Sequence, residues 1–598
     1  MTGLSRRRLL QSAAVTAAAL GLPMSKVGSA FAAPLAPAAD APSTLLQTIR
    51  QRSIGNVEYR TLLPNAGEPY LPRLDILKKT PPAARAKTRR SLYYLGHLSD
   101  IHIIDAQSPA RVEPLLAQSV ATWNGSARPQ DTMSVNVLSE MVNSMNAMRV
   151  SPLTGAPVTA FLNTGDNADM YSNLELEWYI KILDGGSVTP NSGAPKVYEG
   201  MQSWLDTEMI YHPEQPGDDA YGKYGFPQIP GLLDAVVSQT VTSPGLDAPW
   251  YTVFGNHDQL YFGFFPIDSA LRALAVGKKK PYEWQALVSN YLAGWAQQAN
   301  PLSRFTHMLT TNFGPQSGFR DVTPDGARAL FTHQEFMQAH FNTTPFPGPV
   351  GHGFTQQNLQ TNETWWSTTI GNNLRIFGLD TCNSVLGADG ALPQNQFDWL
   401  KAGLADAAQK KQLAIVMSHH NSLTLENGAQ PAFGPSQPLV HTDEFIAMLQ
   451  EFPNMVAWIN GHTHNNTIQA HPRDGGGGFW EITTASCIDF PQQQQMIEIV
   501  DNRDGTMSLF TTVIDHAAPP VWRKGDFSQV GLASLSRELA SNDFTEKPLI
   551  RRGSPDDRNT ELLMPAPFDL SAITDAEVER LQGESRARFL RRQAGANQ

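Results

Sequence analysis

The chain has 598 residues, more than one typical domain, and 41% of them are apolar, which is enough for a large buried core. Its formal net charge is −11 and only 17% of its residues are charged, which excludes the composition of a disordered chain. Two cysteines, Cys382 and Cys487, are too few for a disulfide scaffold. Each closely follows a predicted strand, and we expect buried free thiols, with a single disulfide as the alternative.

Residues 1–32 have the pattern of an export signal. An S-R-R-x-L-L pattern at residues 5–10 precedes an apolar stretch at 13–23, and Ala-Phe-Ala at 30–32 is a small-x-small cleavage pattern. The segment resembles a twin-arginine signal, which implies the twin-arginine export machinery as a partner during export. The mature protein would then be exported to the periplasm, the cell envelope or the extracellular space. The alternative, a membrane anchor, needs a longer apolar run of about 20 residues.

The mature chain is expected to be acidic. Loss of the four basic residues in the signal changes the formal net charge from −11 to −15. This charge disfavours nucleic acid as a partner. No later segment reaches the length of a membrane span, so we expect no stable span.

After an N-terminal extension at residues 33–90, predicted strands and helices alternate in the manner of an α/β sandwich. We assign the main domain to residues 91–515. Residues 516–598 form a C-terminal extension in which the pattern fades before a surface helix at 575–592. The expected strands are 93–99, 157–162, 250–254, 374–379, 413–417, 455–460 and 479–484, the expected helices are 133–148, 394–408 and 443–449, and two closing antiparallel strands are expected at 496–500 and 507–514.

Two long intervals in this pattern mark insertions near residues 185–248 and 259–373. Both are rich in Gly, Pro and aromatic residues, and both far exceed the dozen or so residues that a crossover between strands requires. We expect them to form a cap over the strand ends. The alternative is that they only cover the outside of the fold.

Five short motifs, each after a predicted strand, carry side chains that bind metal ions. They are Asp100-Ile101-His102, Gly165-Asp166-Asn167, Gly255-Asn256-His257-Asp258, Ser418-His419-His420 and Gly461-His462-Thr463-His464. Carboxylate, imidazole and amide groups are the ligands of hard and borderline divalent ions. Each motif alone is weak evidence, but the set in this order predicts a site for two metal ions.

The spacing within the motifs suggests how the ligands are shared. Asp100 and His102 are one residue apart, so both point the same way if the chain stays extended after its strand. A site for two ions about 3.5–4 Å apart needs a bridging carboxylate, and Asp166 follows a glycine that allows a sharp turn. Asn256 offers a neutral oxygen, which leaves His257 free of metal binding.

The five motifs together resemble the calcineurin-like metallophosphoesterase superfamily, whose pattern is D-x-H, G-D-x-x, G-N-H-[DE], a later His and G-H-x-H. The resemblance covers roughly residues 92–515. It implies a four-layer α/β/β/α sandwich with long cap-like insertions and two divalent metal ions, either Mn, Fe or Zn. It also implies a role for His257 in stabilising charge on a phosphate, with Asp258 as its orienting partner. The implied ligands are Asp100, His102, Asp166 and His464 for one ion, and Asp166, Asn256, His419 and His462 for the other.

The sequence departs from the family pattern in two places. The family often has H-x-P in the fourth motif, whereas this chain has His419-His420-Asn421, which leaves His420 as a competitor of His419. Purple acid phosphatases have a metal-binding tyrosine three residues after the bridging aspartate, and Asp169 at that position disfavours an iron–tyrosinate site. The Gly-Asp-x-x-Asp pattern resembles the branch with cyclic-nucleotide and related phosphodiesterases, which does not fix the substrate.

These observations predict an exported dinuclear phosphoesterase. It would hydrolyse small phosphomonoesters or phosphodiesters by attack of hydroxide held between the two ions. A non-catalytic, metal-stabilised envelope binding protein is one alternative. A secreted nuclease is another, but it would need a basic and aromatic groove, which the acidic charge disfavours.

Overall fold

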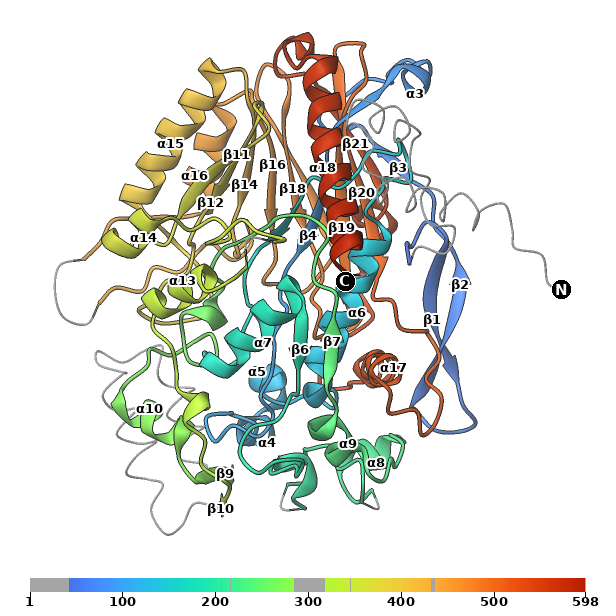
Figure 1. Ribbon diagram of the computed structural model, residues 1–598, viewed down its shortest axis with the longest axis vertical. Helices are drawn as coiled ribbons and strands as arrows, with labels where there is room; N and C mark the ends of the chain where they lie inside the picture. The colour runs from blue at the N-terminus through green and yellow to red at the C-terminus, as the bar shows by residue number, and fades with distance from the viewer. Residues whose placement is uncertain are drawn as a thin grey trace.

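The computed structural model describes residues 42–205, 207–215, 217–283, 318–344, 346–431 and 436–596. The predicted signal at residues 1–32 lies outside the described residues, as does part of the second insertion. Two central sheets and the helices around them give a mixed α/β fold, which confirms the expected class (Figure 1). Among the described helices, none has both the length and the apolar character that crossing a bilayer requires.

The first sheet has seven strands in the order β3-β21-β20-β19-β4-β5-β8. Strands β4, β5 and β8 are parallel to one another, whereas β19 and β20 are antiparallel neighbours beside β4. The two closing antiparallel strands predicted from the sequence are therefore confirmed. The bounds are β3 (Leu71–Arg73), β4 (Arg90–Leu98), β5 (Ala160–Asn163), β8 (Trp250–Thr252), β19 (Gln493–Asp501), β20 (Thr506–Asp515) and β21 (Thr560–Pro565).

The second sheet has six strands in the order β11-β12-β14-β16-β18-β17. The four inner strands are parallel, and every residue of β14 and β16 is buried, as expected for continuous apolar strands covered on both faces. Residues 473–477 connect β17 to the antiparallel β18 as a hairpin. The bounds are β11 (Trp366–Ile370), β12 (Leu374–Gly378), β14 (Leu413–Met417), β16 (Met455–Asn460), β17 (Thr467–Pro472) and β18 (Gly478–Thr483).

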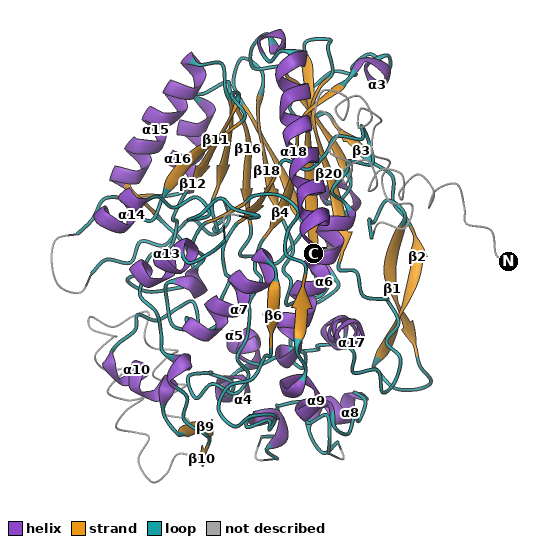
Figure 2. Cartoon of the chain, viewed as in Figure 1, coloured by secondary structure: helices purple, strands orange, loops and turns teal. Residues whose placement is uncertain are grey.

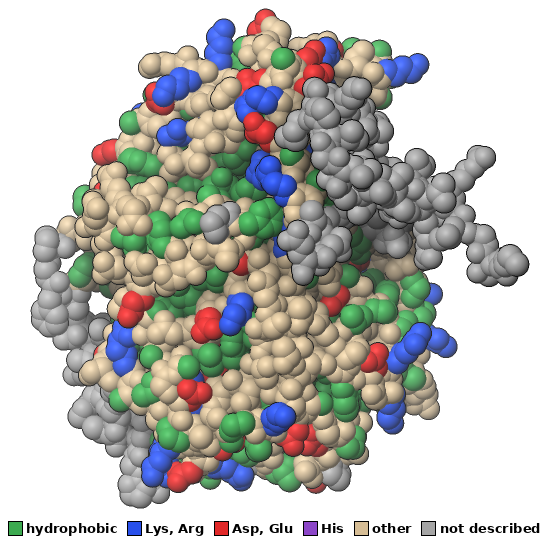
Figure 3. Space-filling model, in the orientation of Figure 1, with side chains coloured by type: hydrophobic (Ala, Val, Ile, Leu, Met, Phe, Trp, Pro, Cys, Tyr) green, Lys and Arg blue, Asp and Glu red, His purple; other side chains and the backbone are tan. Residues whose placement is uncertain are grey.

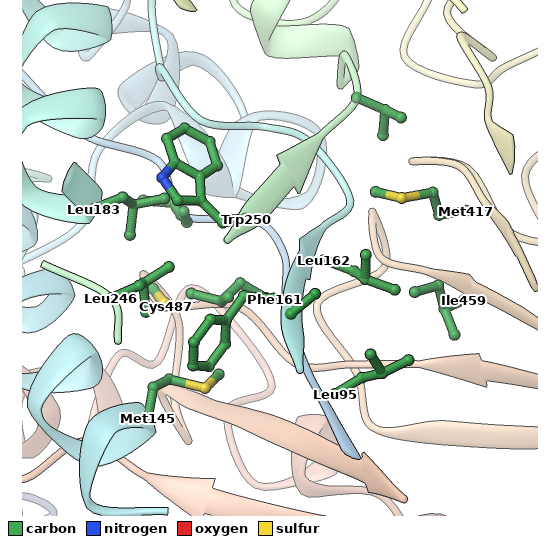
Figure 4. Packing of buried hydrophobic residues seen from close by; sticks show 14 of the residues in the cluster. Leu95, Met145, Phe161, Leu162, Leu183, Leu246, Trp250, Met417, Ile459 and Cys487 are labelled. Atoms are coloured by element: carbon green, nitrogen blue, oxygen red, sulfur yellow. The ribbon is translucent and has the colours of Figure 1, made fainter. Parts of the chain in front are cut away.

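The two sheets share one hydrophobic core. Figure 4 shows Leu162 of β5 near Met417 of β14 and Ile459 of β16, and all three side chains belong to the same buried cluster. On the other face of β5, Phe161 lies against Met145 of α6 (Ser134–Ala147). A second buried cluster joins the six-stranded sheet to α15 (Gln394–Gln409) and α16 (Thr442–Gln450), which lie to one side in Figure 2.

The ends of the described chain belong to this core as well. β3 precedes the main domain assigned from the sequence and β21 follows it, yet β21 pairs with both β20 and β3. Helix α17 (Gln529–Ser541) contacts α6, and its interior is buried. The helix expected at 575–592 is α18 (Asp575–Ala596), which crosses the front of the molecule in Figure 1.

Most of the described insertion residues lie below the sheets in Figure 1, where they form short helices and two-stranded sheets. The end of the second insertion differs from the prediction, because residues 366–370 form β11 and pair with β12 at the edge of the six-stranded sheet. The two-stranded sheets among the described residues pair β1 (Gln47–Ser53) with β2 (Arg60–Ala66), β6 (Gly186–Val188) with β7 (Val241–Ser243), β9 (Lys279–Glu283) with β10 (Gly318–Asp321), and β13 (Leu392–Pro393) with β15 (Leu439–Val440). The remaining helices are α3 (Arg85–Thr88), α4 (Pro114–Gln118), α5 (Val120–Trp123), α7 (Asn173–Asp184), α8 (Ala220–Tyr224), α9 (Leu232–Ser238), α10 (Ser269–Val276), α13 (His333–Phe341) and α14 (Gln356–Thr361).

Candidate metal centre

All five predicted motifs follow the carboxyl ends of parallel strands. Asp100 comes after β4, Asp166 after β5 and Asn256 after β8, in the seven-stranded sheet. His419 comes after β14 and His462 after β16, in the other sheet. The carboxyl ends of parallel strands meet at one edge of a sheet, which is where α/β proteins bind their ligands.

The backbone at these motifs is strained. Asp100, His102, Asp166, His462 and His464 all have positive φ, between 47° and 68°. Non-glycine residues adopt this conformation at a cost of about 1–3 kcal/mol each, and such residues gather at functional sites. The expectation that the chain stays extended through Asp100 and His102 was wrong. The two loops after β4 and β5 turn in the left-handed region and remain hydrogen-bonded to each other, with the His102 amide donating to the Asp166 carbonyl at 2.9 Å.

One group of ligand atoms forms around Asp100. Its Oδ1 lies 3.2 Å from Nε2 of His464, and that nitrogen lies 3.2 Å from Nε2 of His102. All three side chains are buried. A second group forms around Asp166, whose Oδ2 lies 3.1 Å from Nε2 of His419 and 3.5 Å from Nε2 of His102.

Asp166 therefore lies between the two groups. His419 Nε2 is in turn 3.2 Å from Nδ1 of His462, which extends the second group. Asn256 completes the set of predicted ligands. Its Nδ2 donates to the Gly263 carbonyl at 3.0 Å, while its Oδ1 is buried and has no hydrogen-bond partner among the described residues. A buried carbonyl oxygen without a partner is costly, unless a cation binds it.

Hydrogen bonds fix the tautomers of three of these histidines. His102 Nδ1 donates to Asp169 at 2.9 Å, His464 Nδ1 to Asp489 at 2.6 Å, and His419 Nδ1 to the Thr164 carbonyl at 2.9 Å. These oxygens can only accept, so in the neutral rings each Nε2 carries a lone pair. Nε2 of His464 lies 3.2 Å from both Nε2 of His102 and Oδ1 of Asp100, an arrangement that a shared proton or a metal ion stabilises. The donor set thus fits divalent ions, with outer carboxylates that orient the imidazoles as in known metal sites.

The electrostatics of the site also favour positive charge. Burial acts to lower the pKa of His464, but Asp100 and Asp489 outweigh it and raise this pKa to about 9. Burial likewise acts to lower the pKa of His419, and Asp166 outweighs it and raises it to about 9. The buried carboxylates of Asp100 and Asp166 thus favour positive charge beside them, which either protons on the histidines or metal ions can supply.

Sequence reasoning missed the residues that hold these histidines in place. Asp169 accepts from His102 and from Arg111 Nη1, the latter at 2.7 Å. Asp489 accepts from His464 and from Arg128 Nε, the latter at 2.6 Å. The sequence marked Asp169 by its position three residues after Asp166 without indicating this role, whereas no pattern in the sequence marks Asp489 or the two arginines.

The geometry favours His419 over His420 as a ligand. His420 lies close to His419 and His462, so the three rings could meet an ion by distance alone. Both ring nitrogens of His420 are already used, because Nε2 donates to the Ala388 carbonyl at 2.7 Å and Nδ1 accepts from Thr381 at 2.9 Å. His419 keeps Nε2 for the site.

His257 and Asp258 differ from expectation in one respect. His257 Nδ1 donates to the backbone carbonyl of Asp169 at 2.7 Å, so Asp169 orients this ring. The carboxylate of Asp258, expected to do so, accepts instead from the amides of Gly255, Asn167 and Ala168 at 3.0–3.1 Å. Asp258 therefore joins the second and third motifs rather than orienting His257.

His257 keeps one open ring nitrogen at the edge of the site. Burial lowers its pKa to about 4, so the ring is neutral, with its proton on Nδ1. A Cβ on Gly263 would lie 2.6 Å from Nε2 of His257, so the absence of a side chain there keeps room at this nitrogen. Gly263 has a φ of 62°, which also favours glycine. With Asp166 and His102, His257 is close enough to meet an ion, so distance alone does not exclude it as a ligand.

Both insertions contact the loops of the site. In the second insertion, Lys280 Nζ donates to Glu113 at 2.8 Å, and Arg111 Nε lies 3.4 Å from the same carboxylate oxygen. In the first, Ser192 donates to Asp105 at 2.7 and 2.8 Å, just after the first motif. The two cysteines are free and buried, as expected.

The described residues thus define a mixed α/β fold with Asp and His side chains gathered where divalent ions could bind. No family model matches the chain, and no curated protein matches it. Among solved structures, it is similar to the crystal structure of a dimetal phosphatase from Danio rerio. That likeness has a TM-score of 0.31 and 11% identity, and it covers 71% of this chain and 100% of the other. A likeness this low does not assign a function.

Proposed function

We propose that the protein is a metal-dependent phosphoesterase that hydrolyses phosphomonoesters or phosphodiesters. The observation that carries the proposal is the position of Asp166, whose carboxylate lies between His102 and His419 at the carboxyl ends of both sets of parallel strands. Such a shared carboxylate is what a centre with two ions requires.

In this proposal Asp100, His102 and His464 hold one ion, His419, His462 and Asn256 hold the other, and Asp166 bridges them. Divalent ions bound there would activate water and neutralise charge on the phosphate. The oxygen and nitrogen ligands suit Mn, Fe or Zn. The buried Asn256 Oδ1 and the 3.2 Å approach of the Nε2 atoms of His102 and His464 support this assignment.

His257 would act on the substrate itself. Its Nδ1 proton is held by the Asp169 carbonyl, so Nε2 is the nitrogen that can exchange a proton with a leaving oxygen. A bound phosphate is negatively charged and raises the pKa of a neighbouring imidazole, so Nε2 would take up a proton when the substrate binds and would pass it to the leaving oxygen as the ester bond breaks. Proton transfer of this kind typically contributes about 10²–10⁴-fold to the rate.

The proposal includes the four-layer α/β/β/α arrangement and export. The shared core between the sheets, with α6 on one side and α15 and α16 on the other, supports the layers. The S-R-R-x-L-L pattern at residues 5–10 supports export through the twin-arginine machinery. Replacing Arg6 and Arg7 with Lys should retain the protein inside the cell, and unchanged export would contradict this part.

The test of the activity uses the purified protein, stripped of metal and reloaded with Mn²⁺, Zn²⁺, Ca²⁺ or Fe²⁺. We expect hydrolysis of an aryl phosphomonoester or diester with at least one ion, and its loss in Asp166→Asn but not in the surface control Asp398→Asn. His257→Ala should lower kcat/KM by about 10²–10⁴-fold with normal metal content. Metal loss in His257→Ala would instead make His257 a ligand.

Two results would favour the other classes of function. Metal binding without turnover of any ester would indicate a metal-stabilised binding protein. Efficient cleavage of nucleic acid would indicate a nuclease. The face of the molecule in Figure 3 has acidic and basic side chains intermixed rather than a basic groove.

A further inference from the structure

A tight turn at residues 260–265 packs its backbone against the edge of the His257 ring that carries Nε2. The Gly263 carbonyl in this turn accepts from Asn256 Nδ2 at 3.0 Å, and the Gly263 backbone lies against the His257 ring. The turn is closed by hydrogen bonds between Tyr261 and Phe265, with the Tyr261 amide donating to the Phe265 carbonyl at 2.7 Å. The Tyr261 hydroxyl also donates to the Ala110 carbonyl, which ties the turn to the loop after β4. Residues 260–265, named here the aromatic turn, are therefore fixed next to two proposed site residues.

The aromatic turn presents Phe262 beside His257. The two ring centroids are 5.7 Å apart in an edge-to-face arrangement, and Trp123 lies behind Phe262 with a centroid distance of 6.2 Å. Phe262 is half-buried and has a φ of 52°. A bulky residue in this conformation is strained, and strain of this kind concentrates at active sites and ligand clamps.

The chain opposite the aromatic turn connects to the other side of the site. The Gly387 amide donates to the Phe264 carbonyl at 2.9 Å, and Leu386 beside it is half-buried. In the same loop, Asp389 lies 3.9 Å from Nε2 of His462. An ester placed with its leaving oxygen at His257 Nε2 therefore has Phe262 next to its leaving group.

We propose that Phe262 selects phosphoesters whose leaving group carries a planar aromatic ring. This rests on the proposed function, because it assigns the leaving group to the side of His257. A planar ring can stack on Phe262 or meet it edge-to-face, whereas a flexible aliphatic chain gains only apolar contact. Stacking of a base on an aromatic side chain strengthens binding by roughly tenfold or more. A nucleoside and a simple aryl group share this chemistry.

Two matched pairs of substrates test this selection, because the members of each pair release a similar hydroxyl group and differ in whether the leaving group carries an aromatic ring. Adenosine 5′-monophosphate and ribose 5-phosphate release the same primary hydroxyl, as do benzyl phosphate and cyclohexylmethyl phosphate to a close approximation. We expect kcat/KM to favour the ring-bearing member of at least one pair roughly tenfold. The pair that shows the preference identifies a nucleoside or a simple aryl group. In Phe262→Leu the ratio should fall towards one, whereas Phe452→Leu, a half-buried phenylalanine on another face, should keep it.

A second measurement does not need activity. Saturation-transfer NMR on the metal-free protein should show transfer to the ring protons of adenosine, and this transfer should weaken in Phe262→Leu but not in Phe452→Leu. Equal kcat/KM within both pairs, or a ratio unchanged in Phe262→Leu, would overturn the selection by Phe262 while leaving the phosphoesterase in place. Absence of turnover of all four esters with every ion would instead overturn the proposed function.

Discussion

At the scale of single residues, the geometry of the site depends on groups that are not among its candidate ligands. Asp169 and Asp489 each accept one hydrogen bond from a histidine and one from a buried arginine, so each carboxylate is held from two sides. Such outer contacts fix the tautomer and direction of a metal-binding imidazole. Their cost is the burial of several charges, which is stable only while every partner is present.

Asp258 is the residue whose role changed most, and it gives a prediction. Asp258→Asn puts an amide group before the backbone N–H groups of Gly255, Asn167 and Ala168, so we expect at least one of these donors to lose its acceptor. A buried donor left unpaired costs about 1–3 kcal/mol. Denaturant unfolding should show this loss, together with weaker metal binding.

Asp398→Asn on the exposed face of α15 is the matched control and should change stability by less than about 0.5 kcal/mol. If Asp258→Asn kept full stability and metal affinity while only turnover fell, Asp258 would act in catalysis and not in joining the loops.

At the scale of elements, the sequence predicted the buried strands that precede the five motifs and missed others, among them β3 and β21. Continuous apolar runs such as 413–417 and 455–460 coincide with β14 and β16, because parallel strands covered on both faces need apolar residues throughout. β3 has only three residues and pairs with β21, almost 500 residues later. Nothing local marks so short a strand, since its stability comes from a distant partner.

The same limit applies to the site. Its candidate ligands lie in motifs of three or four residues that the sequence shows directly, but Asp489 reaches His464 only through the fold. The left-handed backbone at Asp100 and His102 was also unpredictable, because local preference favours extended residues there and the surrounding loops override it.

Lys280 of β9 connects the second insertion to the site and provides a test at this scale. Lys280 is fully buried and donates a hydrogen bond to Glu113. The same carboxylate of Glu113 contacts Arg111, and Arg111 donates to Asp169. Lys280→Met leaves a buried carboxylate short of a partner and should cost about 3–5 kcal/mol of unfolding free energy.

The double variant Lys280→Met with Glu113→Gln should cost less than the sum of the two single variants, because the orphaned charge is then removed. Lys181→Met, in an exposed ion pair on α7, should cost under about 0.5 kcal/mol. Additive effects of Lys280 and Glu113 would show that the buried pair does not couple the insertion to the site.

At the scale of the whole molecule, one core includes both sheets and the C-terminal segments, and several neutral histidines lie inside it. Burial lowers the pKa of His97 to about 3 and holds those of His340 and His516 well below 6.5. Below pH 6.5 the unfolded chain therefore binds protons that the folded chain does not. The contribution of these histidines to the free energy of unfolding is therefore constant above pH 6.5. It falls as the pH drops below 6.5, by up to about 1.4 kcal/mol per pH unit for each such histidine.

His340→Asn should reduce that slope between pH 6 and pH 5 by about one proton. Asn can replace Nδ1 of His340, which lies 3.0 Å from Nδ1 of His352. Unfolding free energies measured across this range give the slope independently of any overall loss of stability. A slope equal to that of the unchanged protein would mean that His340 is protonated in the folded state.

The central claim is that the carboxylate of Asp166 unites two metal positions, and metal content measures this most directly. After purification and loading, mass spectrometry of the bound metal should find about two divalent ions per chain, and Asp166→Asn should retain at most one. Asp398→Asn should retain both. A protein that binds no divalent ion, or an Asp166→Asn variant that keeps both ions, would contradict the account.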